Sequence, residues 1–173
     1  VKYVKFPVGK TKIRVLDAEP HSRWTHWIKQ ANAGKGMSVD CIGKGCPVCR
    51  QIVEDKKAKR EKRYGSSKSH AINVLVKEQL GNAVNEVMIL DKGNSIFGMM
   101  ADIMSENGDL RNYDLNIIRK GENLGDISYT VMPVYPPSEL TEAEKALPKV
   151  DIKEMRKPLT AEQIETLMAG GTL

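Results

Sequence analysis

The cysteines constrain this chain more than any other feature, because all three fall within nine consecutive positions. Cys41 precedes a Cys-x2-Cys knuckle, Cys46-Pro47-Val48-Cys49, whose tight turn points two sulfurs the same way. An odd number of cysteines argues against a secreted disulfide scaffold. The spacing instead predicts a metal site, and three free thiols are the alternative.

A tetrahedral structural metal site needs a fourth ligand, which His21, His26 or His70 can supply. We favour His26, because it lies on a predicted strand upstream of the cysteine loop. The predicted ligands of one structural Zn2+ are therefore His26, Cys41, Cys46 and Cys49. A catalytic zinc would keep an open position and a carboxylate base, but the loop offers only Asp40 among lysines.

Basic and acidic residues are segregated along the chain, so the formal net charge of +5 understates the local charge. Residues 1–70 hold 17 Lys/Arg against 6 Asp/Glu, which is +11. Residues 71–173 hold 10 against 16, which is −6. This asymmetry favours a polyanionic partner on the basic part, although a charged run is also typical of a solvated helix face.

Hydrophobic periodicity predicts an α+β fold that is mainly β with helices. The predicted strands cover residues 10–16, 23–29, 71–77, 85–90, 113–119 and 127–134. The Gly-rich stretch 31–45 is predicted to be a loop, and a basic helix is predicted over 48–63. Ser95 is the predicted cap of a second, apolar helix. Capping boxes at Thr141 and Thr160 predict two short helices in the tail.

The order of these features resembles the zinc-containing single-stranded-DNA-binding proteins of tailed phages, the T-even phage helix-destabilising protein-like family. The resemblance covers roughly residues 10–137. It is carried by the His26-Trp27 strand, the Cys46–Cys49 knuckle, Lys62-Arg63, the Ala71–Val76 strand and Tyr129-Thr130-Val131.

The resemblance implies an oligonucleotide-binding (OB) barrel of five to six strands within a core over residues 1–137. A zinc subdomain is inserted at about 26–64, and a helical extension follows over 138–173. The implied function is non-sequence-specific binding of single-stranded DNA in phage DNA replication, recombination and repair. The implied partners are phage polymerase, helicase loader or recombination proteins, with self-association along the DNA, in the cytoplasm of the infected bacterial host.

Binding of single strands without sequence preference needs cations for phosphates and flat rings for bases. The expected cationic contacts are Lys10, Lys12, Arg14, Arg23, Lys29, Lys56, Lys59, Arg60, Lys62 and Arg63. The expected ring contacts are Trp27, Tyr64, His70, Tyr113 and Tyr129. For each aromatic ring, packing in the core is the alternative to a base contact.

Catalytic patterns do not emerge beside these features, so we expect a protein that is not an enzyme. Gly9-Lys10-Thr11 lacks the earlier glycine of a phosphate-binding loop, and the basic half has no paired carboxylates. The absence of an apolar run of membrane-spanning length, and of a signal segment, favours a reducing intracellular compartment. Two alternatives stay open: a zinc-ribbon module that recruits replication proteins, and a zinc-dependent nucleic-acid enzyme.

Overall fold

The computed structural model describes residues 1–173, which form two compact units. The larger unit consists of Val1–His21 and His70–Met155, and the smaller unit consists of Ser22–Ser69 and Arg156–Leu173. The chain therefore passes from one unit to the other three times.

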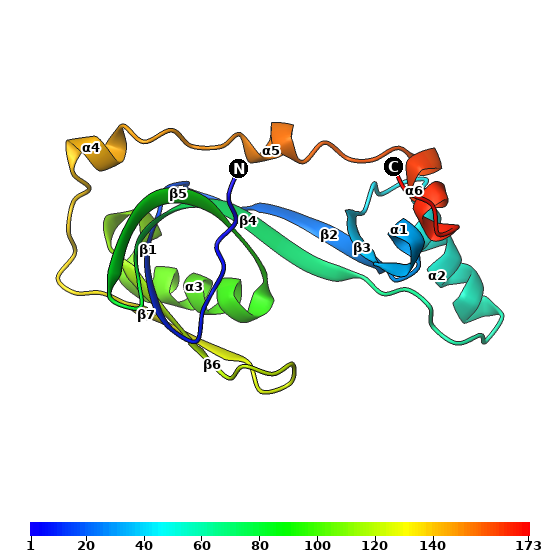
Figure 1. Cartoon of the computed structure of the whole chain (residues 1–173), viewed down its shortest axis with the longest axis horizontal. Helices are drawn as coiled ribbons and strands as arrows, with labels where there is room; N and C mark the ends of the chain where they lie inside the picture. The colour runs from blue at the N-terminus through cyan, green and yellow to red at the C-terminus, as the bar shows by residue number, and fades with distance from the viewer. The chain divides into compact units, whose positions relative to one another are not determined.

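Seven strands form one antiparallel sheet, which confirms an α+β fold that is mainly β. They are β1 (Gly9–Val15), β2 (His21–Ile28), β3 (Met37–Asp40), β4 (Ser67–Gln79), β5 (Asn82–Gly93), β6 (Leu115–Lys120) and β7 (Ser128–Pro133). The strand order is β3-β2-β4-β1-β6-β7, and β5 pairs with β4. In Figure 1, β1, β4 and β5 are strongly curved.

The helices are α1 (Ala31–Gly34), α2 (Pro47–Lys57), α3 (Asn94–Asn107), α4 (Glu142–Lys145), α5 (Ile152–Met155) and α6 (Ala161–Met168). A single 3-10 turn, η1, covers Leu110–Asn112. None of these helices combines the length and the apolar character that crossing a membrane requires.

The core of the larger unit lies between α3 and the strands. Ile13 of β1, Val74 of β4 and Leu115 of β6 are buried there, where Ile96 and Met100 of α3 meet them. The helix turns these residues to one side because they follow its 3.6-residue period. Each fully buried aliphatic side chain contributes about 1.5–3 kcal/mol, so this cluster is the main source of stability in the unit.

The smaller unit has a separate core, to which both of its chain segments contribute. Ile28 of β2 and Val48 of α2 are buried against Ile164 and Leu167 of α6. The Arg156 guanidinium also donates to Asp40 Oδ1 at 2.8 Å. The C-terminal segment, expected only as a helical extension, therefore completes the core of this unit.

The structure corrects several predicted boundaries. The stretch 31–45 is not all loop, because it contains α1 and β3, and β3 pairs with β2. The basic helix ends at Lys57 rather than Arg63, since Lys59 takes a left-handed φ of +53°. Gly93, not Ser95, is the N-cap of α3. Both predicted capping boxes are confirmed, while α5 was not predicted.

Candidate functional site

The side chains of His26, Cys41, Cys46 and Cys49 meet in the smaller unit. Their ligand atoms all lie within 4.8 Å of one another. Cys49 Sγ lies 3.5 Å from Cys41 Sγ and 3.5 Å from His26 Nε2. A tetrahedral zinc centre would place two sulfurs about 3.8 Å apart and a sulfur and an imidazole nitrogen about 3.6 Å apart. We call these four residues the thiol cluster.

The local backbone explains how the cysteines reach one point. Gly43 and Gly45 have φ values of +73° and +82°, which only glycine adopts readily, and Cys46 N donates to Gly43 O at 3.1 Å to close a turn. Cys46 is then the N-cap of α2, with Pro47 at the first helical position, where proline is favoured. Cys49 consequently lies one helical turn further on, facing the same point.

A buried strand position fixes the orientation of the histidine. His26 is 1% exposed on β2, and its Nδ1 lies 2.9 Å from Gly65 O and 3.3 Å from Ser66 Oγ. Nδ1–H donating to the Gly65 carbonyl leaves the Nε2 lone pair directed at the sulfurs. Outer contacts of this kind set the tautomer of metal-binding histidines.

Ionisation of all three thiols together requires a compensating cation. Burial is the largest cause that raises the pKa of Cys49 to about 12, and its hydrogen bond with Cys41 and the charge of Cys46 add to the rise. Burial would also raise the pKa of Cys46, but backbone N–H groups of Cys49, Ile42 and Val48 donate to its sulfur and lower the pKa overall. Three adjacent thiolates repel one another unless a cation compensates them.

The thiol cluster is therefore placed to hold a metal ion. Its donor set of three sulfurs and one imidazole supplies all four positions of a tetrahedron, which fits a structural zinc site. All four predicted ligands are brought together, whereas His21 belongs to the larger unit and His70 shares a hydrogen bond of 2.7 Å with Asn94 Oδ1.

Positive charge is concentrated in the same unit. The smaller unit holds 14 Lys/Arg against 6 Asp/Glu, which is +8, and the larger unit holds 13 against 16, which is −3. Of the expected DNA contacts, Arg23, Trp27, Lys29, Lys56, Lys59, Arg60, Lys62, Arg63 and Tyr64 belong to the smaller unit. Lys10, Lys12, Arg14, His70, Tyr113 and Tyr129 belong to the larger unit.

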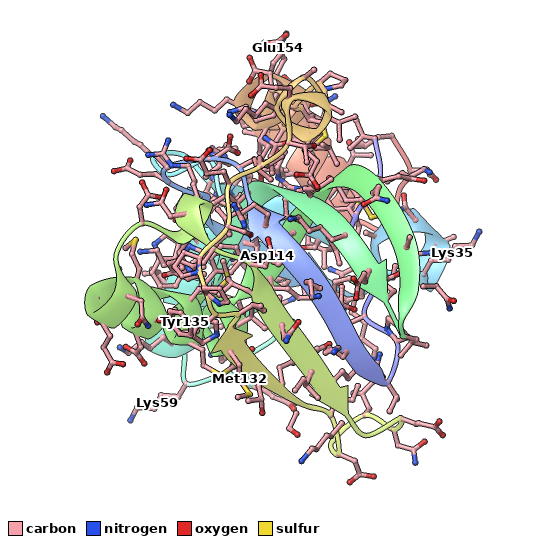
Figure 2. The ribbon with its side chains drawn as sticks, turned by 90° about the vertical axis from the view of Figure 1, so that its left-hand side faces the viewer. Lys35, Lys59, Asp114, Met132, Tyr135 and Glu154 are labelled. Carbon is pink, nitrogen blue, oxygen red and sulfur yellow. The ribbon has the colours of Figure 1, made fainter.

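Most of the expected contacts in the smaller unit are exposed. Trp27 is 57% exposed on β2, and the exposed cations are Lys29, Lys56, Lys59, Arg60, Lys62 and Arg63. Figure 2 shows the Lys59 side chain extending outward from its turn. Tyr64 differs, because its ring is buried and its hydroxyl accepts from Gln30. Arg23 is half-buried and donates to Asp40 Oδ1 at 3.0 Å.

Two expected contacts in the larger unit are interior residues, and we remove them from the candidate surface. Arg14 is 1% exposed, and its Nε donates to Asp114 Oδ1 at 2.8 Å. The Tyr113 ring is buried, and its hydroxyl donates to Gly108 O at 2.9 Å. Both side chains serve the fold, because a buried guanidinium or hydroxyl needs such partners.

The remaining expected contacts in the larger unit vary in exposure. Lys10 is exposed, and Lys12 is half-buried, 3.5 Å from Glu78. The His70 ring packs on Phe97, with centroids 5.0 Å apart. Tyr129 is half-buried on β7.

Sequence reasoning missed three residues beside these contacts. Lys92 lies 5.6 Å from the ring centroid of Tyr129, in cation–π geometry. Trp24 is 52% exposed under Lys68, although it lies only two positions before the buried His26 on β2. Asp55 organises the basic residues after α2. In the sequence, the only indication of this role is that Asp55 directly precedes a run of basic residues.

No protein-family model matches this chain, and no curated protein matches it. The family resemblance therefore stays a prediction.

Proposed function

We propose that this protein binds single-stranded DNA without sequence preference, through an OB-type barrel and a zinc-ordered basic unit. The observation that carries the proposal is the coincidence, in one unit of net charge +8, of the thiol cluster, an exposed tryptophan and a run of exposed lysines. A binder of single strands needs cations for the phosphates and rings on which any base can stack.

The order of strands in the larger unit supports the OB arrangement. Its strands follow one another in space as β5-β4-β1-β6-β7, so β1 is central and the β4–β5 and β6–β7 hairpins flank it. The OB fold is a partly open five-stranded barrel, and strong curvature of β1, β4 and β5 fits it (Figure 1).

In an OB arrangement the smaller unit would supply part of the surface that binds the DNA. OB folds bind oligonucleotides with the face of their second and third strands and with the loops after the first and fourth strands. Here the loop after the first strand runs from Leu16 to Ser66 and includes most of the smaller unit. The loop after the fourth strand is 121–127, where the Leu124 side chain is fully exposed.

In this proposal the metal is one Zn2+ with a structural role. It would be held by His26 and the three cysteines, and its contribution is to fix the knuckle and the start of α2. The chain itself binds the DNA: Trp27 offers a face to a base, and the lysines neutralise phosphates. A stacked base contributes about 1–3 kcal/mol.

The proposed mechanism is passive. The protein traps transient single strands and thereby shifts duplex melting by mass action, without a reaction. We propose that it serves phage DNA replication, recombination and repair, alongside phage polymerase, helicase loader or recombination proteins. That setting rests on the family resemblance.

A fluorescence titration tests the proposed function. We expect an oligothymidylate of about 16 nucleotides to quench Trp27, and a duplex of equal length to bind much more weakly. If about five phosphates are neutralised, raising salt from about 50 to 200 mM lowers the affinity about a hundredfold. Equal affinity for duplex, or affinity independent of salt, would contradict the proposal.

One observation favours a protein-binding alternative. A cavity of about 450 Å3 lies beside the knuckle, lined by Gly45, Cys49, Arg50 and the exposed Val53. A zinc-ribbon module that binds replication proteins could use this surface. It would bind metal and leave the tryptophan fluorescence unchanged when oligothymidylate is added.

A further inference from the structure

The residues that follow α2 fold around one buried carboxylate. Asp55 lies in the last turns of α2 and is only 3% exposed. Its Oδ1 accepts from Gln51 Nε2 at 3.0 Å and from Arg63 Nη2 at 3.0 Å, and its Oδ2 accepts from Arg63 Nε at 3.2 Å. The hydrogen bonds from Arg63 lower the pKa of Asp55, which keeps the carboxylate charged at neutral pH.

The same residue also holds the backbone of the segment 56–63. Arg60 N donates to Asp55 O at 2.9 Å, and Arg60 Nε lies 3.3 Å from Asp55 Oδ1. Between them Lys59 takes a φ of +53°, a left-handed conformation that costs a non-glycine residue about 1–2 kcal/mol. The contacts to Asp55 offset this cost and turn the chain back toward α2.

This turn encloses a cavity of about 440 Å3 with a mixed lining. Its apolar part comes from Ile52 and Tyr64, and its cations are Lys56, Lys59, Arg60 and Lys62. Because Asp55 offsets part of the charge of the two exposed arginines, the three lysines supply most of the uncompensated positive charge here. An apolar wall beside cations matches a nucleotide, which carries a flat base next to a phosphate.

We propose that Asp55 is a positioning residue that shapes residues 52–64 into a subsite for one nucleotide of the bound strand. The base would lie against Ile52 on the apolar side of the cavity, and the phosphate among Lys56, Lys59 and Lys62. This inference rests on the proposed function and adds to it the place of one nucleotide and the residue that builds that place.

The substitution Asp55→Asn tests the inference, because a charge effect and a positioning effect would change the DNA affinity in opposite directions. Removing a negative charge beside five cations should by charge alone strengthen DNA binding. If Asp55 positions the segment, binding should weaken instead, because a neutral amide cannot hold two guanidiniums. We expect the Kd for the oligothymidylate to rise about 5- to 10-fold.

Glu61→Gln is the matched control, since Glu61 is an exposed acid of the same segment. It removes the same charge without touching Asp55, and we expect an equal or lower Kd. An Asp55→Asn variant that binds as tightly as Glu61→Gln would overturn the inference. Failure of the unaltered protein to bind oligothymidylate at low salt would instead refute the proposed function itself.

Metal content and thermal unfolding of each variant separate positioning from loss of fold. Should Asp55→Asn lose its metal or its cooperative unfolding, Gln51→Met provides the second test. It keeps the charge and the contacts from Arg63, and removes only the hydrogen bond that Gln51 Nε2 donates to Asp55 Oδ1 at 3.0 Å. Weaker binding with unchanged metal content supports the inference, and unchanged binding overturns it.

Discussion

Among single residues, Gly36 governs the position of the exposed indole of Trp27. Its φ is +79°, and a Cβ at this position would lie 2.3 Å from Cζ2 of Trp27. Ser38 pairs with Trp27 across the β2–β3 ladder. The ring therefore rests against backbone that only glycine permits, in a stretch where the sequence indicates nothing beyond a loop.

We expect Gly36→Ala to displace the Trp27 ring. The added methyl group would clash with the indole, and the left-handed backbone adds strain of about 1–3 kcal/mol. The variant should show altered tryptophan emission, a lower free energy of unfolding and weaker oligothymidylate binding. Fluorescence and chemical denaturation measure these changes.

Gly34→Ala separates the clash from the backbone strain. Gly34 has a φ of +86°, with no atom within 4 Å of the position that its Cβ would take. This variant should lose stability but keep the tryptophan emission of the unaltered protein. Identical emission from the two variants would show that contact with Gly36 does not hold the ring.

The metal ligands could be predicted from the sequence, because three cysteines within nine positions rarely lie so close unless they bind one ion. The interior position of Arg14 could not be predicted from the sequence. Alternation along β1 places Arg14 with Lys10 and Lys12, a pattern typical of a basic face. Its partners Asp114 and Ser138 lie 100 and 124 positions later, and nothing local identifies them.

Among elements, α6 matters most for the site, because it closes the core beneath it. Thr160 caps this helix: its hydroxyl accepts from Gln163 N, and Gln163 Oε1 accepts from Thr160 N. Ile164 and Leu167, one turn further, are fully buried in the smaller unit. The cap is therefore linked to the stability of the unit that holds the thiol cluster.

We expect Thr160→Ala to lower the free energy of unfolding of the smaller unit by about 0.5–2 kcal/mol. Denaturation monitored by tryptophan fluorescence measures this, since Trp24 and Trp27 both belong to that unit. Thr141→Ala is the control, because it removes the same capping box from α4, which has no buried residue. Equal effects on tryptophan-detected unfolding would contradict the special role of α6.

The segment before α5 is tied to the rest of the larger unit through Asp17. Its Oδ2 accepts from Asn73 N at 3.0 Å, and Asn73 Nδ2 donates to Val150 O at 2.9 Å. Its Oδ1 accepts from Lys149 Nζ at 2.9 Å. Burial raises the pKa of Asp17, but the hydrogen bonds from Asn73 and Lys149 outweigh burial and lower it below 3.8.

This lowered pKa predicts a pH dependence with a definite sign. A carboxyl whose pKa is lower in the folded state stabilises the fold above its unfolded value and loses that contribution as the pH falls through the folded value. The stability difference between the unaltered protein and Asp17→Asn should be constant near neutrality and disappear well below pH 3.8. Denaturation at several pH values tests this; a constant difference would contradict it.

Strands and long helices could be predicted, because their apolar residues recur with the period of a strand or of a helix. The four-residue strand β3 could not, since Met37–Asp40 lies among glycines and is recognised only through its pairing with β2. The end of α2 was equally hidden: residues 58–63 lack Gly and Pro, and their turn depends on Asp55.

At the scale of the whole molecule, positive charge and the thiol cluster coincide in one unit made from two distant segments, 22–69 and 156–173. The first segment could be predicted, because the cysteines and lysines lie there. The contribution of the second segment could not be predicted. Its helix α6 carries only a modest apolar stripe, and its partners Ile28 and Val48 are distant in the sequence.

We expect chelation to loosen both segments together. A structural metal contributes directly to folding, so its removal should expose amides of residues 22–69 and of α6, while the α3 amides stay protected. Hydrogen exchange with and without a chelator measures the pattern. Loss of protection confined to residues 41–49 would contradict one cooperative unit.

The division of the smaller unit between two segments also sets an order of events at the ribosome. The last cysteine is position 49, but the α6 residues that cover the same core are positions 164 and 167. At about 5–20 residues per second, the gap lasts roughly 6–23 seconds. During that interval the thiols are already synthesised and their core is open on one side, so early metal capture would protect them while the chain is completed.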